Sequence, residues 1–105
     1  MLLAAGKIES EVRVDGIPKE ITLFTAEQDT KVTFMQFVSE KPLTDTTLSI
    51  FIVFKINQVR VIPETKMKTN ILQFEVNYDL QDIEYIFAIA NTDDVINYII
   101  NGELL

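Results

Sequence analysis

The sequence lacks several residue types on which common enzyme chemistries depend. It contains no cysteine, no histidine and no tryptophan in 105 residues. Without cysteine the chain has no thiol nucleophile, and without histidine it lacks the commonest general base and nitrogen metal ligand at neutral pH. Zinc sites of the Cys/His kind cannot form. We therefore expect no metal and no cofactor, and we predict that the protein is not an enzyme.

Targeting and membrane signals are also scarce. The opening MLLAAGK has no basic segment before its apolar residues, as a secretory signal would require. The longest apolar run, in residues 49–56, is far shorter than the roughly 18 residues of a membrane-spanning helix. We expect a cytoplasmic protein that does not contact a membrane.

The residues that are present suit a packed globular domain. Hydrophobic residues make up 48% of the chain, and there are only three glycines and three prolines. A chain of this length can bury a core without disulfides or metals. We therefore expect one domain over residues 1–105.

Short apolar segments with a two-residue period recur along the chain. The clearest is residues 7–14, which Asp15 and Gly16 would connect by a tight turn to a returning strand over residues 17–25. Pro63 is expected to end the strand that pairs with residues 47–56. The other predicted strands are residues 31–38, 59–62, 70–76 and 84–90. This spacing predicts a mainly β protein, an antiparallel β-sandwich-like domain of about seven short strands.

The last segment favours a helix. Thr92 can cap it, Asp93 and Asp94 suit its first turn, and Gly102 stands where a left-handed terminator belongs. Against this, four of the six residues 95–100 are β-branched, which suits a strand. We expect a short C-terminal helix, with an α+β fold as the alternative class.

Two predicted strands, residues 31–38 and 47–56, carry apolar side chains on both faces. Something must then cover the second face. Either the C-terminal helix lies across it, or the side chains form a patch that a second copy or another protein covers. The candidate interface residues are Met35, Phe37, Phe51 and Val53.

Charge is distributed unevenly along the chain. Residues 47–70 hold four bases and one acid, net +3, whereas residues 71–105 hold seven acids and no base, net −7. An acidic C-terminal third disfavours direct binding of nucleic acid. The bases either pair with acids on neighbouring strands, or meet the acidic end of a second copy in a head-to-tail assembly. The candidate charged contacts are Arg60, Lys66, Lys68, Asp79, Asp82, Asp93 and Asp94.

These observations lead to three hypotheses of function. The first is a non-enzymatic protein–protein interaction or assembly module, a structural subunit or adaptor that self-associates and whose partner is protein. The second is a small acidic inhibitor that imitates nucleic acid toward a basic groove of a target protein. The third is a small-ligand or carbohydrate-binding β domain that uses carboxylates and Tyr85, although the lack of tryptophan leaves few rings on which a sugar could stack.

Overall fold

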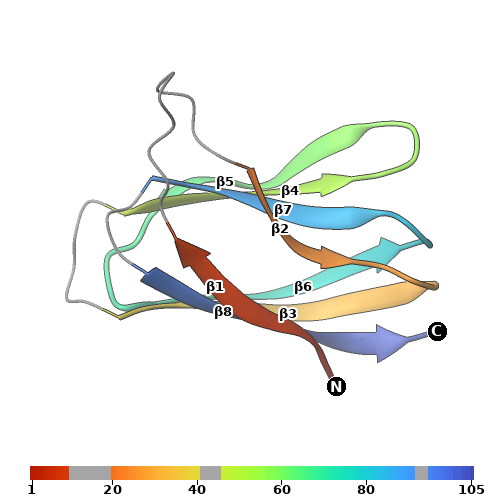
Figure 1. Ribbon diagram of the computed structural model, residues 1–105, viewed down its shortest axis with the longest axis horizontal. Helices are drawn as coiled ribbons and strands as arrows, with labels where there is room; N and C mark the ends of the chain where they lie inside the picture. The colour runs from red at the N-terminus through yellow and green to blue at the C-terminus, as the bar shows by residue number, and fades with distance from the viewer. Residues whose placement is uncertain (10–19, 41–45, 92–94) are drawn as a thin grey trace.

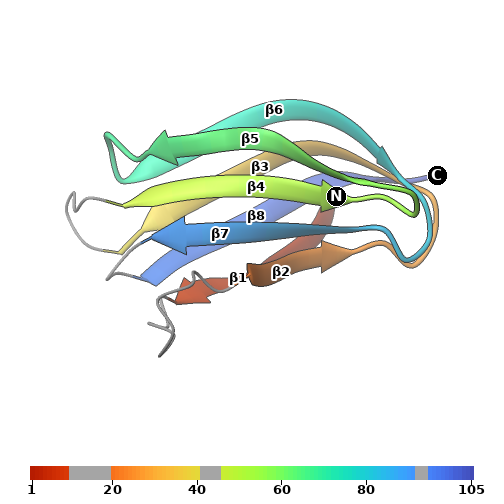
Figure 2. The same ribbon diagram turned by 90° about the horizontal axis from the view of Figure 1, so that it is seen from above.

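The computed structural model describes residues 1–9, 20–40, 46–91 and 95–105. These residues form two four-stranded antiparallel sheets that pack face to face (Figures 1 and 2). The first sheet has the order β1-β8-β3-β6, and the second has the order β2-β7-β4-β5. The strands are β1 (Leu2–Glu9), β2 (Glu20–Thr25), β3 (Thr30–Ser39), β4 (Thr47–Val53), β5 (Gln58–Lys66), β6 (Ile71–Leu80), β7 (Tyr85–Asn91) and β8 (Val95–Leu104).

The pairing of the strands defines a jelly roll. The first strand pairs with the eighth, the second with the seventh, the third with the sixth and the fourth with the fifth. This is the pattern of one long hairpin, folded at the β4–β5 turn and then rolled into two sheets. The prediction of a mainly β antiparallel sandwich is confirmed, with eight strands in place of about seven.

The predicted C-terminal helix is wrong, because the same residues form β8. This strand lies in the middle of its sheet between β1 and β3, where Ile96, Tyr98 and Ile100 point into the core in alternation. The β-branched side chains therefore decide the conformation of this segment. Thr92, Asp93 and Asp94 lie outside the described residues.

No helix that could cross a membrane is found in the part of the chain that the structure describes.

Two details of the predicted strands also need correction. The first strand starts at Leu2, and β1 and β2 belong to opposite sheets, so they do not form the predicted hairpin. The predicted turn at Asp15 and Gly16 lies outside the described residues. Pro63 does not end β5 but lies within it. Proline is tolerated there because β5 is an edge strand, on which one row of backbone groups faces away from the ladder.

A β-bulge explains why residues 31–38 look apolar on both faces. The pairing register of β3 shifts between Val32 and Phe34, both against β6 and against β8. An extra residue in a strand reverses the side to which later side chains point. Val32, Met35 and Phe37 consequently all face the core, and Phe34 is only half-buried.

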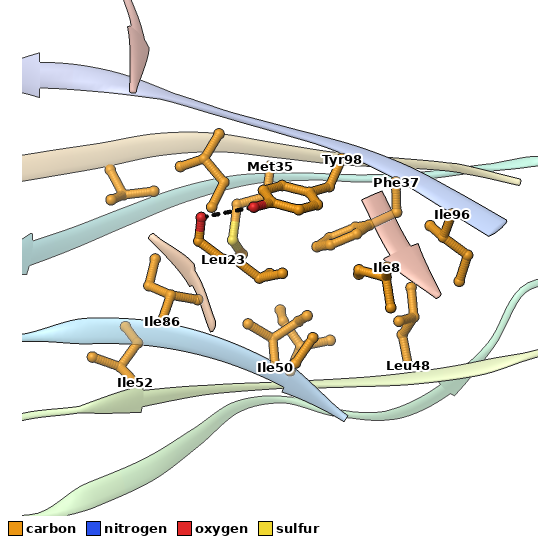
Figure 3. Packing of buried hydrophobic residues seen from close by; sticks show 14 of the residues in the cluster. Ile8, Leu23, Met35, Phe37, Leu48, Ile50, Ile52, Ile86, Ile96 and Tyr98 are labelled. Atoms are coloured by element: carbon orange, nitrogen blue, oxygen red, sulfur yellow. Dashed lines mark hydrogen bonds between the residues drawn. The ribbon is translucent and has the colours of Figure 1, made fainter. Parts of the chain in front are cut away.

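The core lies between the two sheets and is almost wholly aliphatic. Figure 3 shows side chains from both layers meeting there, with Phe37 and Ile96 from the first sheet and Ile50 and Ile86 from the second. The hydroxyl of Tyr98 donates a hydrogen bond of 3.0 Å to the carbonyl oxygen of Leu23, and so connects the two sheets (Figure 3).

Candidate interaction site at the loop end

The structure does not bring the four predicted interface side chains together. Met35 and Phe37 have no exposed surface, because they point into the core from β3 (Figure 3). Phe51 and Val53 lie on β4, on the face of the second sheet that points away from the core. The two pairs therefore belong to different layers and cannot form one surface.

The outer face of the second sheet carries a row of stacked groups. Phe51 pairs with Arg60 on one side and with Phe87 on the other. The two rings are stacked, with centroids 4.8 Å apart and planes 8° apart, and the Arg60 guanidinium lies 5.0 Å from the centroid of the Phe51 ring. Phe51 is only 8% exposed and Phe87 only 1%. On this outer face the Phe51 ring of β4 thus packs against Phe87 of β7 within the monomer. The two rings offer little surface to a partner.

The predicted charged contacts are separated along the sandwich. Lys66 ends β5 and Lys68 follows it, whereas Asp79 lies near the far end of β6 and Asp82 lies in the loop beyond. Because β5 and β6 run in opposite directions through the molecule, these bases and these acids lie at opposite ends (Figure 1). Among the described residues, no ion pair joins Arg60 or Lys68 to Asp79 or Asp82. Lys7 and Glu40 do form an ion pair, with 3.7 Å between the Lys7 nitrogen and a Glu40 carboxylate oxygen.

Exposed apolar side chains gather at one end of the sandwich. We call this the loop end: it consists of residues 26–29, 54–57 and 81–84, together with residues 1–2 and 104–105, which the ribbon places at the same end (Figure 1). Ile56 is 94% exposed and Ile83 is 65% exposed. Eight large hydrophobic residues are exposed in the described part of the chain, and six of them belong to the loop end: Met1, Leu2, Ile56, Ile83, Leu104 and Leu105.

A buried carboxylate holds two of these loops together. Glu84 is only 6% exposed, and each of its carboxylate oxygens accepts a backbone hydrogen bond. One oxygen accepts from the amide of Gln81 at 2.6 Å, and the other accepts from the amide of Lys55 at 3.0 Å. Glu84 therefore fixes the loop that carries Ile83 against the loop that carries Ile56, and both of its oxygens are already engaged in structural bonds.

The third loop is joined to the same unit by backbone bonds. Ile83 donates to the carbonyl oxygen of Ala26 at 2.8 Å, and Ala26 donates to the carbonyl oxygen of Glu84 at 2.9 Å. At the chain end, Leu105 donates to the carbonyl oxygen of Asp29 at 2.9 Å. The exposed side chains of the loop end are thus displayed by a bonded framework.

Ile83 adopts a backbone conformation that β-branched residues rarely take. Its φ is 71°, in the left-handed region that favours glycine and asparagine. Such a residue costs roughly 1–3 kcal/mol. Its side chain is exposed, so burial in the monomer does not offset that cost. Strained residues of this kind concentrate at sites of function.

The loop end also contains an open cleft of about 560 Å³. Phe54, Ile56 and Leu80 give it an apolar lining, and Asp29 and Asp79 contribute carboxylates. Lys55, Asn57, Gln81, Glu84 and Leu105 complete the lining. The cleft thus combines apolar walls with negative charge.

No metal-binding arrangement accompanies these carboxylates. In residues 1–9, 20–40, 46–91 and 95–105, no group of three acids is close enough to hold a metal ion. The charges around the loops are predominantly negative, with acids at Glu27, Asp29, Asp79, Asp82 and Glu103 and bases at Lys31, Lys55 and Arg60. The loop end can therefore offer apolar contact and attraction for cations.

The chain matches no family model, no curated protein and no solved structure. The jelly roll itself occurs in capsid proteins, lectins and cupins, so the fold does not select a function.

Ile56 and Ile83 were missed by the sequence analysis. A usable signal was present, because Ile83 stands alone between Asp82 and Glu84 in a polar turn, and an isolated apolar residue there has no strand face to occupy.

Proposed function

We propose that this protein is a non-enzymatic protein–protein interaction module, a structural subunit or adaptor of a larger assembly, and that the loop end is its contact surface. The observation that carries the proposal is the gathering of exposed large apolar side chains at one end of a sandwich whose core is otherwise closed. Apolar clusters of this kind mark contact sites on soluble proteins.

Rigidity supports the same proposal. The Glu84 carboxylate and the backbone bonds of Ile83 fix the loops before any partner binds. A surface that is already ordered loses less conformational entropy on association. The engagement of Glu84 in two backbone bonds also argues against a catalytic role for the one buried carboxylate at this end.

Self-association through this surface is proposed to be head-to-tail. A symmetric contact would place the loop ends of two copies against each other, and their acids would then repel. A head-to-tail contact would instead bring the acids of one copy to Lys68 of the next, which follows the opposite end of β5. Such an arrangement produces rings or filaments.

Two measurements test the proposal. Light scattering over a concentration series should give a mass that rises above 12.0 kDa for the wild type and stays at 12.0 kDa for the Ile56→Ser variant. In the native host, a photo-crosslinking amino acid at position 56 should give adducts that the same residue at position 71 does not. Ile71 is a matched control, because it is 50% exposed but lies at the opposite end of β6. A constant 12.0 kDa mass together with no adducts specific to position 56 would contradict the proposal.

A second candidate function is an acidic inhibitor directed at a basic groove of a target protein. The observation that favours it is the excess of acids over bases around the loops, including Asp79 and Asp82. Changing Ile83 to Ser, which leaves Asp79 and Asp82 in place, separates the candidates. An inhibitor that binds through its acids would keep its target, whereas a module that binds through exposed apolar side chains would lose partner crosslinking at position 56.

A further inference from the structure

We infer that the loop end binds a cationic, amphipathic segment of a partner protein, in which Lys or Arg side chains enter the acidic cleft and neighbouring apolar side chains cover Ile56 and Ile83. This inference rests on the proposed function and names the chemical class of the partner.

The cleft has the features that a long basic side chain requires. Lys and Arg bury their methylene groups on apolar surface and keep the charged group near water or a counter-ion. Phe54 and Leu80 supply apolar surface, and Asp29 and Asp79 supply negative charge beside it. Lys55 also lines the cleft, but Asp29, Asp79 and Glu84 outnumber it.

The surroundings of the cleft extend the same complementarity. Ile56 and Ile83 stand on neighbouring loops that Glu84 holds together. The five acids around them outnumber the three bases Lys31, Lys55 and Arg60. A partner that is both apolar and basic therefore gains at both kinds of group, whereas an acidic partner or an anionic lipid surface is repelled.

The probe is a short synthetic peptide in which Lys and Leu alternate, labelled with a fluorophore and titrated with the full chain at physiological salt. Two comparison peptides carry Glu in place of Lys, or Ser in place of Leu. We expect the Lys–Leu peptide to bind about tenfold more tightly than either of them. Amide chemical shifts should change in residues 54–57 and 81–84.

Variants of the protein assign the binding to the cleft. Asp79→Asn should weaken binding of the Lys–Leu peptide about tenfold, and Ile56→Ser should do the same. Each has a matched control on β6 outside the cleft: Glu75→Gln removes the same charge, and Ile71→Ser removes a similar apolar side chain. Both controls should bind as the wild type does.

The outcomes separate this inference from the proposed function. Equal binding of the Lys–Ser peptide, or equal effects of Asp79→Asn and Glu75→Gln, would overturn the inference, because general attraction to an acidic protein would then explain the result. Binding of the Glu–Leu peptide at the loop end would overturn it too, while leaving the interaction surface intact. The inference would also be overturned if the protein sedimented together with phosphatidylcholine vesicles and the Ile56→Ser variant did not. That result would identify a membrane as the occupant of the loop end. Photo-crosslinking at position 56 reports on the proposed function independently of any peptide.

Discussion

Tyr98 in β8 donates a hydrogen bond to the carbonyl oxygen of Leu23 in β2, with 3.0 Å between the two oxygen atoms. The two strands belong to opposite sheets, so the bond crosses the core (Figure 3). The Tyr98 ring also lies against Gly6 of β1, where an added Cβ would come within 2.9 Å of the hydroxyl oxygen. One side chain thus orients three strands at this point of the core.

Removing that hydroxyl should cost stability without changing the fold. In Tyr98→Phe the Leu23 carbonyl loses its partner while the ring keeps its packing. We expect the free energy of unfolding to fall by about 1 kcal/mol. Urea denaturation with an unchanged m-value would measure it. A loss close to zero would mean that the carbonyl finds water as a substitute.

Alkaline pH should destabilise the protein through the same group. Burial raises the pKa of Tyr98 above its ordinary value of 10.0, because the phenolate would be poorly solvated. Because the pKa of Tyr98 is higher in the folded state than in the unfolded state, the contribution of this group to the free energy of unfolding is fully present below pH 10. That contribution is lost as the pH rises through the folded-state pKa. Burial also raises the pKa of Tyr78, so part of the effect belongs to that residue. Tyr98→Phe should therefore reduce the decline of stability above pH 10, and an unchanged decline would contradict this.

Regular strands could be predicted from the sequence because alternation alone determines them. In β6, Leu72, Phe74 and Val76 pack against the core while Glu75 and Asn77 are exposed, as the pattern predicts. The prediction failed in β3, where the bulge between Val32 and Phe34 moves Met35 and Phe37 from the expected second face into the core. A bulge leaves no clear signal in composition, so strict alternation was extended across it.

The candidate site as a whole could not be predicted from the signal at Ile83, because it depends on how loops meet. Ile56 and Ile83 lie in different connections, and only the bonds from the Glu84 carboxylate to the amides of Lys55 and Gln81 bring those connections together. The sequence showed Glu84 as one of several acids. Whether a carboxylate is buried and bonded to backbone depends on the strand order, which the sequence pattern did not supply.

Gly102 should be intolerant of any side chain. An added Cβ would overlap the carbonyl oxygen of Lys31, so the backbones of β8 and β3 would have to separate. We expect Gly102→Ala to lower the free energy of unfolding by about 1–3 kcal/mol. Gly6→Ala is the matched comparison, because its nearest atoms belong to the Tyr98 side chain, which can shift more readily. Thermal unfolding should therefore rank Gly102→Ala as the less stable variant, and the reverse order would contradict the close approach of the two strands.

Glu84→Gln should loosen the loop end. The amide oxygen of Gln can accept one of the two backbone bonds, but its NH₂ group would then face the other backbone N–H. Leaving a buried donor without an acceptor costs about 1–3 kcal/mol. Hydrogen exchange should accelerate at the amides of Lys55 and Gln81 and remain unchanged in β8. Glu75→Gln makes the same chemical change at an exposed position of β6 and should leave these rates unaltered.

Ile83→Asn should separate binding from stability. The substitution removes an exposed apolar side chain and places a residue that tolerates positive φ where φ is 71°. Relief of the strain should raise the free energy of unfolding by about 1 kcal/mol. Ile56→Asn is the control, because it also removes an exposed isoleucine side chain. Among the described non-glycine residues, positive φ occurs at Ile83 and not at Ile56, so Ile56→Asn has no such strain to relieve. If the loop end is the contact surface, both variants should weaken partner crosslinking at the loop end, yet only Ile83→Asn should gain thermal stability. A gain of stability with undiminished binding would show that the strain at Ile83 serves no contact.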